Sequence, residues 1–127
     1  MAIRDSGDDL LAHGVELFNS RYFFEAHELL EDVWLHDRSP SRRFYQGLIQ
    51  IASAYHHCVN GNYRGALDLF VRGSDLLRPY GKSYLGVDLE DLLARVAQDA
   101  EVVRTLRDGA VAGEPVVPPQ IRYEPSH

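Results

Sequence analysis

Apolar residues recur at spacings of three and four along most of the chain, the pattern of amphipathic helices. Clusters of Asn, Gly, Ser and Pro interrupt this pattern and mark the turns. The pattern predicts five helices, over about residues 8–18, 22–36, 40–59, 63–78 and 88–109. Residues 80–87 are expected to form a loop, after which Asp88 caps the fifth helix. Because the expected helices are joined by short turns, we predict an all-α fold, a compact five-helix bundle.

Two of the helix junctions resemble each other. Residues 19–26 and 60–66 each contain an Asn, a turn, a Tyr and then an Ala about one helical turn later. We therefore predict two antiparallel helical hairpins with tetratricopeptide-like turns, and a fifth helix that caps them. The expected organisation is a single domain over residues 1–127, with a helical core at 8–110. Residues 111–127 hold four of the six prolines, so we expect an extended tail there.

The second predicted helix carries polar chemistry on its apolar face. Phe23, Leu30 and Trp34 form one stripe along this helix. His27 falls within that stripe, and Glu31 follows it by one turn, so the two side chains are neighbours. We expect a buried His27–Glu31 network, since a carboxylate near an apolar face needs a partner. Such a network either fixes how the helices dock or forms part of a ligand or metal site.

The third predicted helix is expected to be the central, most enclosed one. Residues 44–63 contain no Asp, Glu, Lys or Arg, whereas a surface helix normally carries charge. Its face opposite the apolar stripe holds four uncharged polar residues, Gln46, Gln50, Ser53 and His57. These side chains either meet the His27–Glu31 face or are simply hydrated.

Composition and charge exclude several classes of function. The net charge of -6 disfavours nucleic acid or an anionic membrane as the partner, because both call for a basic face. No apolar run reaches the ~18 residues of a membrane span, and residues 1–6 lack a signal-peptide pattern. We therefore expect a cytoplasmic protein. The single cysteine, Cys58, excludes an internal disulfide and is expected to be buried as a small hydrophobe.

Two functions remain open from the residues alone. The favoured one is a helical scaffold or interaction module that binds a protein partner or a second copy, without a cofactor. The alternative is a small-molecule or metal-dependent, hydrolase-like enzyme with Glu31 as base or ligand and His27 as ligand or proton shuttle. Gln46, Gln50 and His57 (or His56) would complete its site.

A metal site is expected to be poor in ligands. His27 and Glu31 do not form the His-Glu-x-x-His pattern of zinc proteases, and the third helix offers no acidic residue. We therefore expect no metal; the candidate ligands, were one to bind, are His27, Glu31 and His57.

Several motifs together resemble one known family. They are Glu25-Ala26-His27-Glu28-x-Leu30-Glu31-x-x-Trp34, Gln46-Gly47-Leu48-Ile49-Gln50-x-Ala52, His56-His57 and Gly61-Asn62-x-x-Gly65-Ala66. The chain resembles the bacterial, archaeal and plant domain-of-unknown-function family 309 over about residues 18–77. The resemblance implies an all-helical bundle, with His27, Glu31 and Trp34 as hallmark positions and no assigned activity. The candidate functional residues are His27, Glu28, Glu31, Trp34, Gln46, Gln50 and His57.

Overall fold

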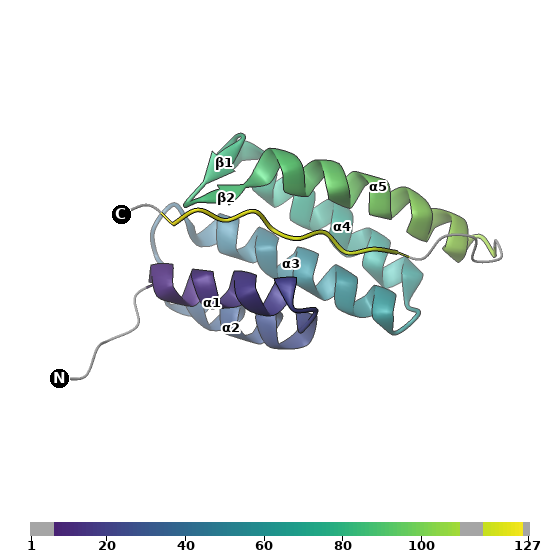
Figure 1. The fold of residues 1–127 in the computed structure, drawn as a ribbon, viewed down its shortest axis with the longest axis horizontal. Coiled ribbons are helices and arrows are strands. Elements are labelled where there is room, and N and C mark those ends of the chain that lie inside the picture. The colour runs from purple at the N-terminus through teal and green to yellow at the C-terminus, as the bar shows by residue number, and fades with distance from the viewer. Residues whose placement is uncertain (1–6, 110–115, 126–127) are drawn as a thin grey trace.

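The computed structural model describes residues 7–109 and 116–125, and the predicted all-α fold is confirmed (Figure 1). The expected ends of the domain and the expected start of the tail, at residues 1–6, 110–115 and 126–127, lie outside the described residues. The five helices are α1 (Gly7–Asn19), α2 (Phe23–His36), α3 (Arg42–Val59), α4 (Tyr63–Leu77) and α5 (Leu89–Arg107). None of these helices is long and apolar enough to cross a membrane.

The connection between α4 and α5 contains regular structure where the sequence predicts a loop. A short 3₁₀ turn, η1 (Arg78–Tyr80), precedes the two-residue strands β1 (Ser83–Tyr84) and β2 (Val87–Asp88). The strands pair antiparallel around Leu85 and Gly86, both at positive φ. Asp88 then caps α5 by accepting a hydrogen bond from Asp91 N (3.0 Å). The loop prediction is therefore wrong in detail, because a hairpin this short leaves almost no alternating pattern.

Helix α3 begins two residues later than predicted. Pro40 was the expected first residue, whereas the helix starts at Arg42. In the loop before α3, side chains accept hydrogen bonds from the backbone N–H groups of the loop itself. Asp37 Oδ1 accepts from Ser39 N (2.6 Å), and Ser39 Oγ accepts from Ser41 N (3.1 Å). These local bonds stabilise non-helical backbone, as Asp and Ser side chains often do.

The expectation that α3 is the central helix is confirmed. It packs against both α2 and α4 and lies between the α1–α2 hairpin and the helices α4 and α5 in Figure 1. Half of its residues are buried, namely Phe44, Tyr45, Gly47, Leu48, Ile49, Ile51, Ala52, Ala54 and Tyr55. The α3–α4 contact is close at Gly47 and Gly73, where a Cβ on Gly73 would lie 3.0 Å from Gly47 O. Larger residues there would push the two helices apart.

The two hairpin turns have the same backbone geometry. Arg21 and Gly61 occupy the left-handed position, with φ of 71° and 76°. After each, one N–H reaches back five residues: Tyr22 N to Leu17 O and Asn62 N to His57 O, both 2.9 Å. Tyr22 therefore occupies the position in the first turn that Asn62 occupies in the second. The sequence repeat aligned Tyr22 with Tyr63, which is one residue too far along the chain. The likeness to tetratricopeptide turns stays a prediction.

Aromatic rings form the centre of the core. Tyr55 of α3 is fully buried, and its ring centroid lies 5.6 Å from those of Phe18 and Phe23 and 4.9 Å from that of Phe70. These rings join α1, α2 and α4 to α3. Residues 116–125 run as an extended segment along the bundle and end beside the β-hairpin (Figure 1).

Candidate functional site

The His27–Glu31 pair forms, but it is not buried. His27 Nε2 lies 3.4 Å from Glu31 Oε2, and the two side chains are 27% and 48% exposed. The predicted burial is therefore wrong. Helix α2 is covered by α1 and α3, and the residues that face them are Phe23, Ala26, Leu30 and Val33. His27 lies at the margin of that covered stripe, so its ring reaches the surface.

Two of the predicted residues, His27 and His57, do come together at a pocket between α2 and α3. The pocket has a volume of about 200 Å³ and is lined by Phe24, His27, Ser53, His56 and His57. We call it the histidine pocket. The Phe24 ring lies between two imidazoles, with its centroid 6.0 Å from that of His27 and 5.5 Å from that of His56. The polar stripe of α3 thus meets His27 through Ser53 and His57.

The turn after α3 orients the imidazoles of His56 and His57. Asn62 Nδ2 donates to His57 Nδ1 (3.1 Å), and Asn60 Nδ2 donates to His56 Nε2 (3.2 Å). An imidazole nitrogen that accepts a hydrogen bond carries no proton, so neutral His57 is protonated on Nε2 and neutral His56 on Nδ1. Each ring therefore keeps one N–H that these asparagines do not use.

Several other candidate residues do not line the histidine pocket. Glu28 is exposed, and Gln46 and Gln50 are half-buried; none of the three lines the pocket. The Gln50 Oε1 and Trp34 Nε1 atoms are buried and accept or donate no hydrogen bond within the described part of the chain. Their role as functional residues stays a prediction.

Trp34 stabilises the connection between α2 and α3. The Arg42 guanidinium carbon lies 4.3 Å from the centroid of the Trp34 ring. The same group donates to Trp34 O (2.6 Å) and Asp37 O (3.1 Å). A cation over an aromatic face is attracted to it, and the two carbonyls belong to the last turn of α2 and the residue after it. This arrangement gives Trp34 a structural role.

The residues proposed as metal ligands do not assemble into a site. Over residues 7–109 and 116–125, no group of three or more His, Cys, Asp or Glu side chains is placed to hold one ion. His27, Glu31 and His57 therefore lack the geometry that the metal-dependent alternative requires.

Sequence reasoning missed a buried polar pair. Asp99 of α5 is only 8% exposed, and Tyr55 donates its hydroxyl hydrogen to Asp99 Oδ2 at 2.5 Å. The signal was present in the spacing, because Asp99 continues the buried series Leu89, Leu92, Val96 and Val103. A charged residue at a core position of a helix marks either a partner or a site.

Burial changes the acidity of the groups around Asp99. It raises the pKa of the Asp99 carboxyl above its ordinary value, and the hydrogen bond from Tyr55 opposes this only in part. Burial also raises the pKa of the Tyr55 hydroxyl. Cys58 is half-buried, and burial, with a smaller effect of the Asp99 charge, raises its pKa to about 12. The Cys58 thiol is therefore not a nucleophile at neutral pH.

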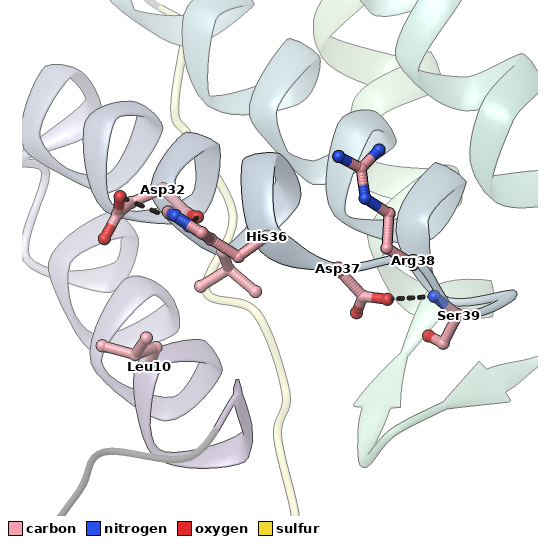
Figure 2. Close-up of a pocket in the computed structure, with 7 residues that line it drawn as sticks. Leu10, Asp32, His36, Asp37, Arg38 and Ser39 are labelled. Atoms are coloured by element: carbon pink, nitrogen blue, oxygen red, sulfur yellow. Dashed lines mark hydrogen bonds and ion pairs between the residues drawn. The ribbon is translucent and has the colours of Figure 1, made fainter.

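A larger pocket, of about 490 Å³, lies at the other end of α2 and contains none of the predicted site residues. Figure 2 shows Leu10 from α1 facing Asp32 and His36, with Asp37, Arg38 and Ser39 following along the loop. His36 and Asp32 are exposed, and their closest side-chain atoms are 3.9 Å apart. A shallow site with side chains this exposed holds a ligand poorly, because water competes for each contact.

Comparisons with known proteins give a family and two relatives, and their descriptions name no activity. Residues 11–69, from α1 to the middle of α4, match the family described as "Domain of unknown function (DUF309)". The chain is 33% identical over 95 residues to the uncharacterized protein YpuF of Bacillus subtilis (strain 168), across 72% of this chain and 55% of YpuF. It is 27% identical over 116 residues to an uncharacterized protein of Aquifex aeolicus (strain VF5), across 91% of this chain and 32% of that protein.

The chain therefore spans about half of one curated relative and about a third of the other. The matched family region contains the whole histidine pocket and the Trp34–Arg42 contact, whereas Asp99 lies beyond it. Residues 11–69 thus match the DUF309 family, whose description assigns no function.

Proposed function

We propose that the protein is a helical interaction module that binds another protein through the histidine pocket. The observation that carries this proposal is the position of the pocket beside exposed apolar side chains. Phe24, in its lining, is 47% exposed, and Val59, one turn after His56, is 71% exposed. Exposed apolar groups gathered around a hollow are typical of interaction sites.

The size of the pocket favours a protein partner over a metabolite. Its volume of about 200 Å³ is below the ~300–1,000 Å³ of usual small-molecule sites. A hollow of this size suits one anchor side chain of a partner, the kind of contact that dominates interface energetics. The Phe24 ring and the imidazoles offer flat faces, while Ser53 and the free imidazole N–H groups offer polar contacts.

The charges around the pocket favour a basic anchor. Glu28 and Glu31 follow Phe24 and His27 by one helical turn and are exposed. The chain also carries a net charge of -6. An arginine from the partner would stack on the aromatic faces and pair with these carboxylates, which a neutral side chain cannot do. We therefore expect a partner segment with a basic surface.

Photocrosslinking from the pocket tests this proposal. A photoreactive phenylalanine analogue replaces Phe24, and a matched probe replaces Val71, which is exposed on α4. We expect a crosslinked partner from position 24 alone, and a dimer if the partner is a second copy. The product should disappear in the His27→Ala/His56→Ala variant and persist in His13→Ala, which changes an exposed histidine outside the pocket. Equal crosslinking from both positions would contradict the proposal.

A hydrolase-like activity is the second candidate, and one observation favours it. Ser53 lines the same pocket as His27, whose ring lies 3.4 Å from Glu31 Oε2, so a nucleophile, a base and an acid are close together. Against it, Ser53 makes no hydrogen bond to a histidine among the described contacts, and such a bond activates a serine.

Labelling with a serine-directed fluorophosphonate separates the two candidates. A hydrolase would be labelled at Ser53, more slowly after His27→Ala, and normally after Ser83→Ala, which changes an exposed serine on β1. An interaction module would show no labelling at Ser53.

A further inference from the structure

Residues 116–125, the extended segment, are held in the way that proteins hold bound peptides. Asn19, at the end of α1, clamps one residue of the segment with its side-chain amide. Its Nδ2 donates to Ile121 O (3.1 Å), and its Oδ1 accepts from Ile121 N (2.7 Å). Both bonds go to the backbone, so this contact does not depend on which side chain the segment carries there.

The segment also pairs with the β-hairpin through an isolated antiparallel bridge. Asp88 N donates to Arg122 O (2.9 Å) and Glu124 N donates to Gly86 O (2.7 Å), on either side of an antiparallel bridge between Val87 and Tyr123. A Cβ at Gly86 would overlap the Glu124 carbonyl, so the hairpin has a glycine where the segment approaches. Adding a strand to an exposed edge is a recurring mode of peptide recognition.

Side chains along the segment alternate between the groove and the solvent. Pro119 and Ile121 are buried, whereas Gln120 and Arg122 are exposed. Arg21, in the α1–α2 turn, donates from Nη1 to Pro119 O (3.1 Å) and fixes the start of this alternation. The backbone contacts therefore provide attachment, and the two buried side chains provide selectivity for a Pro-x-Ile sequence.

A cleft borders the segment on the side that faces α5. Its volume is about 760 Å³, and its bundle side is lined by Arg21, Asp91, Arg95, Gln98, Asp99 and Val102. One ion pair reaches across it to α5, with Arg122 Nε 3.7 Å from Asp91 Oδ2, and Arg122 is exposed to solvent. A segment beside such a cleft loses fewer apolar contacts on leaving than one packed closely against both walls.

We propose that the groove formed by Asn19, Arg21 and the Gly86–Asp88 edge is a peptide-binding site, with residues 116–125 as its exchangeable occupant. The partner is a protein segment that is extended and carries the Pro-x-Ile pattern. This site shares no residue with the histidine pocket, so it stands or falls separately from the proposed function. An occupant tethered in the same chain competes strongly, so a free peptide binds the native protein weakly.

Peptide binding to the full chain tests this proposal. The probe is a fluorescent peptide with the sequence of residues 116–125, and the readout is anisotropy. Ile121→Asp weakens the binding of the tethered segment and leaves the groove intact. The peptide should therefore bind this variant at least about ten-fold more tightly than it binds the native chain. Val117→Asp makes the same chemical change at an exposed position of the segment and should leave the affinity unchanged.

Changing the groove should have the opposite effect. Asn19→Ala added to Ile121→Asp should remove the gain in affinity, and a peptide with Asp in place of the isoleucine should not bind. A folded Ile121→Asp chain, checked by circular dichroism, that binds the peptide no better than the native chain would overturn the proposal. If that variant does not fold, the native chain decides: excess unlabelled peptide should shift the Asn19 side-chain amide signals in an NMR titration, and unchanged signals would overturn the proposal.

Discussion

Two polar pairs in this molecule differ in how far they are exposed to water. His27–Glu31 lies on α2 at the surface, with its atoms 3.4 Å apart and both side chains partly in water. Tyr55–Asp99 joins α3 to α5 through a 2.5 Å hydrogen bond, with Tyr55 fully enclosed and Asp99 8% exposed at the edge of the core beside the cleft. His27 of the first pair lines an open pocket, whereas the second pair belongs to the packing between helices.

The difference follows from what covers each helix face. Tyr55 is surrounded by rings from α1, α2 and α4, and Asp99 approaches it from α5. His27 has α3 on one side only, and the pocket is open beside it. A hydrogen bond in the core replaces water that cannot return, whereas one at the surface is always in competition with water. The buried pair should therefore dominate stability and the exposed pair should affect binding.

The largest effect is expected from removing the central ring. Tyr55→Ala should lower the free energy of unfolding by about 3–5 kcal/mol, because it empties a fully enclosed site and breaks contacts to three other aromatic rings. Chemical denaturation measures this loss. Tyr22→Ala, at a 57% exposed tyrosine, is the matched control and should change stability by less than about 0.5 kcal/mol. Similar losses in both variants would mean that Tyr55 is not in the core.

Removing the hydroxyl alone should have a smaller effect. Tyr55→Phe keeps the ring but leaves the buried Asp99 carboxyl without its hydrogen bond, which should cost about 1–3 kcal/mol. The measurement is again chemical denaturation, with Tyr22→Phe as the control. A neutral Tyr55→Phe change would show that another group or water satisfies Asp99.

The pH dependence of stability isolates Asp99. Its pKa is raised by burial, so the folded state binds a proton more readily than the unfolded state. The stability contribution of this group is therefore highest below its ordinary pKa and falls as the pH rises through the raised value. Measured from about pH 3 to pH 7, the stability of Asp99→Asn relative to the native chain should increase with pH. Asp68→Asn, on an exposed face of α4, should show no such increase.

The smallest effect is expected at the surface pair. Glu31→Ala should lower stability by about 0.2–1 kcal/mol, since the pair is half in water. Thermal melts of Glu31→Ala, His27→Ala and the double variant give the coupling energy. Glu28→Ala, which changes an exposed glutamate three residues earlier on the same helix, is the control. A coupling above about 2 kcal/mol would mean that the pair is enclosed in solution.

The sequence alone determined the helices and their order. Apolar spacing located all five helices, the absence of charge identified α3 as the central one, and Asp88 was expected to cap α5. These features depend on local spacing and capping, which neighbouring residues determine between them. The same spacing placed His27 on an apolar stripe and correctly made it a neighbour of Glu31.

Only the tertiary structure decided which polar groups are enclosed. Periodicity gives the angle of a side chain around its helix, but burial depends on whether another element covers that angle. The packing of the helices left the His27 side chain 27% exposed and enclosed Asp99 against Tyr55. It also placed residues 116–125 against Asn19, which lies about a hundred positions away in the chain. Contacts between residues so distant in the chain depend on how the helices pack, and no local pattern records that.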